Sequence, residues 1–174
     1  MDWSDFESEC RRTVNTLISA ILAENPDEHF YAFCLYTDSS AMAVSLAANS
    51  EEKLKSVLDA DSDKSKENQN YYRWATSEWA YEDFGADLFA ELSAFLRKSP
   101  EREHFPVFKN RLIHSLAYAL SSVVAEIFQN RHDAAVMFVS ITDDDEAEDI
   151  ENSSSEIINT EIAHNLFLTR YDHE

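Results

Sequence analysis

The chain is almost without glycine, with Gly85 as the only one among its 174 residues. Walker-type and Rossmann loops need glycine where the backbone approaches a phosphate, and the G-x-S-x-G turn of α/β-hydrolases needs it where a strained turn exposes the nucleophile. A single glycine cannot form any of these motifs. The sequence therefore excludes the common nucleotide-binding enzymes and the hydrolases that depend on such loops.

Cysteine is also scarce, and neither Cys10 nor Cys34 belongs to a C-x-x-C motif or a paired cysteine and histidine motif. This spacing excludes a disulfide framework and a zinc ribbon. Each cysteine lies within an apolar pattern without an adjacent histidine or lysine, so we interpret both as small buried apolar residues. The first residues include acids, whereas a signal peptide has a basic region followed by an apolar run. We expect a cytoplasmic protein.

Long apolar runs and clustered histidines are missing as well. No apolar stretch approaches the roughly 20 residues that cross a bilayer, which argues against an integral membrane protein. The six histidines are scattered without H-x-x-x-H or H-E-x-x-H spacing, and the calcium-loop pattern D-x-[DN]-x-[DN]-G is absent. We therefore expect no metal, no cofactor and no zinc enzyme.

Basic residues are outnumbered, with 14 lysines and arginines against 34 acids and a net charge of −20, although 44% of the residues are hydrophobic. Arg170 is the only arginine or lysine from Ala134 to the end, where the acids contribute half of the net charge. Such a surface attracts basic proteins over a Debye length of about 8 Å and repels nucleic acid and anionic membranes. We expect a basic protein partner and no direct contact with nucleic acid or membrane.

The length and the apolar periodicity predict a single α+β domain over residues 1–174, because a chain of this size buries roughly 70% of its unfolded surface. Two β-prone runs, His29–Thr37 and Ala41–Ala48, are separated by the turn residues Asp38-Ser39-Ser40 and predict a β-hairpin. Amphipathic spacing predicts helices at about 2–23, 51–58, 86–98, 105–130 and 155–167.

Two further strands are predicted, at Tyr71–Trp74 and at Ala134–Thr142, where a nearly continuous apolar run is typical of a central strand. The polar segment 59–70 reads DADSDKSKENQN and predicts a solvated loop. Residues 143–154 predict an acidic loop or helix. The expected fold is a small, mainly antiparallel sheet of about four strands packed by several amphipathic helices.

The densest acidic stretch follows the last predicted strand and is a candidate for contact with a partner. A basic surface would complement these acids, which a buried strand would present rigidly. The other interpretation is a solvated loop that only promotes solubility. The candidate residues are Asp143, Asp144, Asp145, Glu146, Glu148 and Asp149.

The aromatic segment from Tyr71 to Gly85 is the second candidate site. Tryptophan, tyrosine and arginine dominate interface energetics, so this segment could form a hot spot or a ligand pocket. Glu78 and Glu82 could pair with Arg73, or act as general acid and base in a pocket. The alternative is that the aromatic side chains close one edge of the core. The candidate residues are Trp74, Trp79, Tyr81, Glu78 and Glu82.

The predicted N-terminal helix and four segments after it together resemble a family of uncharacterised bacterial proteins, the domain of unknown function 4303. These segments are FYAFCLYTD (30–38), AAN (47–49), YYRWATSEWAYE (71–82) and VSITDDDEAE (139–148). The resemblance implies a single-domain α+β fold and offers no catalytic residues. Small acidic bacterial families of this kind are similar to immunity proteins encoded beside secreted antibacterial toxins, a functional analogy rather than a consequence of fold.

The sequence thus favours a non-enzymatic immunity-type protein that neutralises a cognate, basic toxin such as a nuclease by direct binding. Two alternatives stay open. One is a small-molecule-binding protein or enzyme that uses the region Trp74–Glu82, with the acidic charge serving solubility. The other is a nucleic-acid mimic whose carboxylates imitate the spacing of phosphates.

Overall fold

The computed structural model of the protein describes residues 1–128 and 135–171. In chain order its elements are α1 (Trp3–Glu24), β1 (Phe30–Asp38), β2 (Ser45–Ser50), α2 (Glu51–Ala60), α3 (Lys66–Trp74), α4 (Ala90–Lys98), α5 (Phe105–Ile127), β3 (Val136–Thr142), α6 (Ala147–Ile158) and α7 (Glu161–Leu168). Short 3-10 helices cover Thr76–Glu78, Ala86–Phe89 and Pro100–His104. The predicted α+β class is confirmed.

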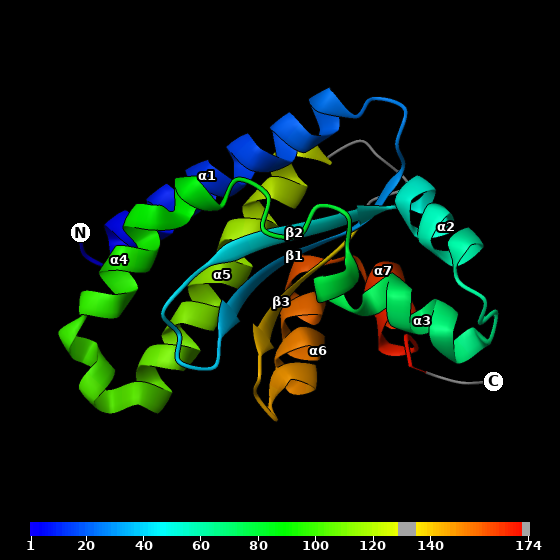
Figure 1. Ribbon diagram of the computed structural model, residues 1–174. Coiled ribbons are helices and arrows are strands. Elements are labelled where there is room, and N and C mark those ends of the chain that lie inside the picture. The colour runs from blue at the N-terminus through cyan, green and yellow to red at the C-terminus, as the bar shows by residue number, and fades with distance from the viewer. Residues whose placement is uncertain (129–134, 172–174) are drawn as a thin grey trace.

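The strands form one mixed sheet in the order β2-β1-β3 (Figure 1). β1 and β2 form the predicted antiparallel hairpin, in which Phe33 lies opposite Ala48. β3 pairs with β1 in parallel, with Cys34 opposite Phe138. The sheet of the described residues therefore has three strands instead of about four, and one of its two pairings is parallel.

The hairpin turn is wider than the sequence predicts, because β2 begins at Ser45 and not at Ala41. The Asp38 carboxylate accepts hydrogen bonds from the backbone N–H groups of Ser40, Met42 and Ala43 at 2.9, 3.0 and 3.0 Å. Ala41 adopts a positive φ of 51° within this turn. One aspartate thus organises residues that the pattern of apolar side chains assigns to the strand.

The predicted strand Tyr71–Trp74 is wrong, since these residues form the last turn of α3. The helix begins inside the segment that we expected to be a loop. Ser65 caps it by accepting a hydrogen bond from the Asn68 N–H at 3.2 Å, and Glu67 lies in its first turn. Capping chemistry therefore outweighs the β propensity of the aromatic residues, and only residues 61–65 separate α2 from α3.

Different helices cover the two faces of the sheet (Figure 1), and each face contributes to its own hydrophobic core. α1 and α5 pack on the face that presents Phe33, Met137 and Val139, and together with α4 they enclose the larger core. The opposite face presents Cys34 and Phe138 to a smaller core, built from the segment around α3 and from α7. The smaller core is the part of the fold that positions the predicted aromatic site.

β3 lies at an edge of the sheet, and β1 is the central strand, so the prediction of a central strand after residue 134 is wrong in position. The strand is nevertheless buried over Val136–Ile141 because its two faces contribute to the two cores and α6 packs along it. A nearly continuous apolar run therefore indicates that a strand is buried, and does not indicate that it is central in the sheet. Ala134, the first residue of the predicted strand, and the predicted helix end near residue 130 lie outside the described residues.

The predicted last helix, 155–167, is divided into the end of α6 and all of α7. Thr160 starts α7 by accepting a hydrogen bond from the Ala163 N–H at 3.3 Å. Of the predicted acidic segment 143–154, residues from Ala147 onward belong to α6. None of the helices in the described part of the chain has the length and apolarity needed to cross a bilayer.

Candidate functional site

The two tryptophans of the aromatic segment are core residues. Trp74 and Trp79 are only 8% and 3% exposed. Trp74 packs edge-on against Phe167 at 5.2 Å between ring centroids, and Trp79 packs edge-on against Phe138 at 6.0 Å. Their large apolar surfaces close the smaller core, which is the structural interpretation that the sequence left open.

Tyr31 joins three segments that are distant in sequence. Its hydroxyl donates to the Arg73 carbonyl oxygen at 2.8 Å and accepts from Asn49 Nδ2 at 3.0 Å. Trp79 Nε1 donates to the same carbonyl at 3.0 Å. Burial raises the pKa of the Tyr31 hydroxyl, so it stays protonated and can donate at neutral pH. Residues of the FYAF, AAN and YYRW motifs meet here in a partly buried polar cluster.

Arg73 pairs with Glu51, and not with Glu78 or Glu82 as the sequence suggested. Its guanidinium donates to both carboxylate oxygens of Glu51 at 3.0 and 2.7 Å and lies 4.5 Å from the centroid of the Tyr31 ring. The helical form of α3, which packs against α2, explains this choice of partner. The pair fixes α3 on the first turn of α2.

The remaining polar residues of the segment point to separate partners. Glu78 accepts a hydrogen bond from the Tyr71 hydroxyl at 3.2 Å and is exposed. The Tyr81 hydroxyl lies 2.9 Å from both Asn25 Oδ1 and Glu28 Oε2. Glu78 and Glu82 do not share a helix, because the 3-10 helix ends at Glu78. The predicted carboxylate pair is therefore not formed.

Two other carboxylates, those of Glu82 and Glu151, accept hydrogen bonds from residues of the sheet. Tyr36 of β1 and Ser140 of β3 are register partners. The Tyr36 hydroxyl donates to Glu82 at 3.0 Å, and Ser140 Oγ donates to Glu151 at 2.7 Å. Two acids, one from the aromatic segment and one from α6, thus reach adjacent positions of the sheet. Glu151 was not among the predicted site residues, because only the fold brings α6 beside β3.

Glu151 occupies an unusual environment for an acid. Burial raises its pKa above the ordinary value, although the hydrogen bond from Ser140 and the charge of Arg170 oppose the shift. Glu82, in contrast, is exposed.

Arg170 is buried, with an exposed fraction of 3%. Its guanidinium donates to Glu151 at 3.0 Å and to Asn152 at 2.6 Å, and lies 4.0 Å from the centroid of the Phe167 ring. It is the only lysine or arginine in residues 135–171. The exposed lysines and arginines of the described chain therefore all lie outside β3, α6 and α7.

Two acids of the predicted acidic stretch hold a lysine. Lys109, on α5, donates to Asp144 and to Glu146 at 2.7 Å each, and its side chain is 11% exposed. Burial lowers the pKa of Lys109, but the hydrogen bonds to the two carboxylates outweigh it and raise the pKa overall. The hydrogen bond from Lys109 lowers the pKa of Asp144. These acids fasten the loop before α6 to α5.

The other acids of the stretch face solvent. Asp143, Asp145, Glu148 and Asp149 are exposed, and no salt bridge involves them among the described residues. The loop that carries them is tied down at Asp144 and continues directly into α6. The structure thus presents the four carboxylates from a segment that is anchored by Asp144.

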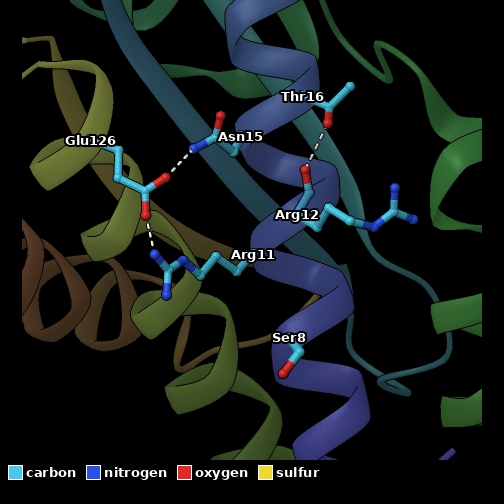
Figure 2. Close-up of a pocket in the computed structure, with 6 residues that line it drawn as sticks. All are labelled: Ser8, Arg11, Arg12, Asn15, Thr16 and Glu126. Atoms are coloured by element: carbon cyan, nitrogen blue, oxygen red, sulfur yellow. Dashed lines mark hydrogen bonds and ion pairs between the residues drawn. The ribbon is translucent and has the colours of Figure 1, made fainter.

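A groove of about 470 Å³, which the sequence did not indicate, lies on another surface between α1 and α5. Figure 2 shows the residues that line it. Glu126 accepts hydrogen bonds there from Arg11 and from Asn15. Arg12 pairs with Glu9 on the same helix. The charged side chains that line this groove are thus all paired. Its full lining is Ser8, Arg11, Arg12, Asn15, Thr16 and Glu126.

The described part of the chain contains potential metal ligands and both cysteines. No three histidine, cysteine, aspartate or glutamate side chains lie together there as a potential metal site. Cys10 and Cys34 are buried, as predicted. Burial raises the pKa of Cys10 to about 12, which keeps the thiol protonated and unreactive at neutral pH. His132 and His173 lie outside the described residues.

Comparison with known proteins shows the family of the chain. No curated protein and no solved structure matches it. One family model does match, the domain of unknown function DUF4303, over residues 10–160. This match includes the partly buried polar cluster around Tyr31 and the acidic stretch before α6. The chain therefore belongs to the DUF4303 family.

Proposed function

We propose that this protein is an acidic binding protein that captures a basic partner protein, and that it acts as an immunity protein against a cognate toxin. The observation that carries the proposal is the charge of the surface formed by the loop after β3 together with α6 and α7. Its exposed charged residues within 135–171 are all acids, because Arg170 is buried and paired with Glu151. A single-sign surface of this kind favours a partner of opposite charge.

The anchored acidic stretch supplies the electrostatic part of the recognition. Asp145, Glu148 and Asp149 are exposed next to the bonds that hold Asp144 and Glu146 on Lys109. Because the loop is already fixed, little conformational entropy is lost when a partner binds. Exposed charges of this kind mainly raise the association rate and select the partner.

A nuclease fits this description of the partner. Its substrate is a polyanion, so its substrate groove carries lysine and arginine that neutralise phosphates. An acidic protein can occupy such a groove and exclude the nucleic acid without catalysing any reaction. The narrower mimicry hypothesis, in which carboxylates imitate phosphate spacing, predicts binding to several unrelated DNA-binding proteins, whereas an immunity protein binds one.

The test begins with a tagged pull-down from the native cells at about 0.1 M salt, and the recovered basic protein is then expressed alone and together with this chain. The proposal requires that the recovered protein is toxic alone and harmless in the complex. The triple variant Asp145→Lys, Glu148→Lys, Asp149→Lys should then slow association about tenfold or more at low salt and flatten its salt dependence.

The matched control reverses three exposed acids on other elements, Glu24, Asp27 and Asp87. It changes the net charge by the same amount and should slow association less. Equal effects of the two triple variants would show that only net charge matters. A recovered protein that is not toxic would remove the immunity role.

A second candidate function rests on the hydrogen bonds that Glu82 and Glu151 accept from the register partners Tyr36 and Ser140. In this case the protein binds a small molecule, or acts on one with the two carboxylates as acid and base. A ligand that raises the melting temperature of the wild type, but not of Glu82→Gln or Glu151→Gln, would support it, provided that both variants remain folded.

A further inference from the structure

The C-terminal helices expose large apolar side chains to solvent. Ile162 is 84% exposed, Leu166 is 63% exposed and Ile157, near the end of α6, is 58% exposed. Ile162 and Leu166 are four residues apart on α7 and therefore lie side by side on one face of the helix. Ile157 lies five positions before Ile162, across the short connection at Asn159 and Thr160. We call these three side chains the apolar stripe.

The fold does not depend on the apolar stripe. The opposite face of α7 packs on the fold through Phe167, which is fully buried. The centroid of its ring lies 4.6 Å from that of Phe138 and 5.2 Å from that of Trp74. Thr160 caps its first turn. Polar residues at positions 162 and 166 would leave these contacts unchanged. A helix that is apolar on both faces is typical of one that is covered on both sides.

We propose that the apolar stripe is the anchor of the interface with the basic partner, which presents an apolar patch flanked by lysine or arginine. This inference rests on the proposed function and names the surface that carries its affinity. Glu156 and Glu161 are exposed beside the stripe, and no exposed lysine or arginine lies in residues 135–171. An apolar centre with a charged rim is the usual anatomy of a specific interface.

Charge also decides against a second copy of this chain as the occupant. In an isologous dimer the same surface meets itself around a two-fold axis. Glu156 and Glu161 would then face the same acids of the other copy, in a protein with a net charge of −20. A basic partner turns the same carboxylates into attractive contacts.

The probe for this surface is a synthetic amphipathic helix with leucines at positions i, i+3, i+4 and i+7 and lysines on both flanks. It is titrated into protein labelled at the isoleucine, leucine and valine methyl groups and followed by NMR. We expect shift changes at Ile157, Ile162 and Leu166. A peptide of the same composition, with its leucines spread around the helix, should bind at least tenfold more weakly.

The double variant Ile162→Ser, Leu166→Ser should weaken binding of the probe at least tenfold and leave the melting temperature unchanged. The matched control, Leu88→Ser with Val107→Ser, removes two side chains that are 48% and 70% exposed on other elements. It should leave binding unchanged.

Three results would overturn the inference. The first is a probe that does not bind, or one that binds with shifts at Leu88 or Val107. The second is binding that is lost in the Asp145, Glu148 and Asp149 charge reversals but not in the double serine variant, which leaves the proposed function standing without this anchor. The third is a wild-type dimer in sedimentation that the double serine variant abolishes. Binding through the side chains of the apolar stripe that survives the charge reversals would instead support the anchor and weaken the electrostatic proposal.

Discussion

The side chain of Asn159 forms hydrogen bonds with both backbone groups of Met137, accepting from its N–H at 2.8 Å and donating to its carbonyl oxygen at 2.6 Å. Ser154 does the same for Val139, at 2.9 and 3.3 Å. The backbone groups of Met137 and Val139 point away from β1, at the free edge of the sheet. Polar side chains at the end of α6 thus replace the missing neighbour strand, and this edge is covered against pairing with another chain.

Asn159→Ala should destabilise the protein by about 2–4 kcal/mol, because it leaves two backbone groups of Met137 without partners in a buried strand. The measurement is urea unfolding followed by circular dichroism. Asn165→Ala, at an exposed position of α7, is the control and should change the free energy of unfolding by less than about 0.5 kcal/mol. Equal stability of the two variants would show that water satisfies the edge of β3.

Gly85→Ala should destabilise the protein by about 1–3 kcal/mol, for two reasons that can be separated. Gly85 has a φ of 67°, and a Cβ at this position would lie 2.2 Å from Leu17 Cδ2 in the larger core. In a Leu17→Ala background the collision disappears but the backbone strain stays. The cost of Gly85→Ala should therefore fall without vanishing, as measured by thermal or urea unfolding of the four proteins of the cycle. If Gly85→Ala is equally destabilising in the Leu17→Ala background, the contact between the new Cβ and Leu17 does not contribute.

Lys109→Met should destabilise the protein by about 2–3 kcal/mol at neutral pH, because Asp144 is left beside the core without its partner. The control Lys98→Met removes an exposed lysine on α4 and should be nearly neutral. Both values come from urea unfolding at neutral pH. A Lys109→Met protein as stable as the control would show that water replaces the ammonium group.

The Lys109 contact also predicts a pH dependence. The folded pKa of Asp144 lies below its ordinary value of 3.8. Its contribution to stability is therefore fully present above pH 3.8 and is lost as the pH falls through the lower, folded pKa. The difference in unfolding free energy between the wild type and Lys109→Met should shrink over this acid range. A difference that stays constant would contradict the assignment.

Glu151 predicts a pH dependence of the opposite sign. Its folded pKa lies above the ordinary value of 4.5, mainly because the carboxylate is buried. As the pH falls from neutral toward 4.5, the folded state takes up this proton before the unfolded state does, so the contribution of Glu151 to stability rises. Carbon-detected NMR titration of the Glu151 carboxyl group should give a midpoint above 4.5.

Arg170 supplies the comparison for that titration. Arg170→Gln should raise the Glu151 midpoint further, since the cation opposes the shift, whereas Arg170→Lys keeps the charge and should raise it less. A midpoint at or below 4.5 in the wild type would show that water reaches the carboxylate.

Much of the fold could be predicted from local patterns. The amphipathic period of α1 and α5, the turn chemistry of the hairpin and the apolar run of β3 each determine an element through interactions between residues close in sequence. The prediction of secondary structure fails where two local signals compete. In α3 the aromatic residues favour a strand, but the Ser65 cap and the polar residues after it favour a helix, and the cap prevails.

The sequence by itself determined the acidic surface, the burial of both cysteines and the absence of glycine-loop chemistry, because composition and short motifs fix these properties. Only the tertiary structure decided the partners of the charged residues. It placed Arg73 on Glu51, Lys109 on Asp144 and Glu146, and Glu151 on Ser140. These contacts join segments far apart in the chain, so no local pattern encodes them, and they decide which acids are occupied and which stay free to meet a partner.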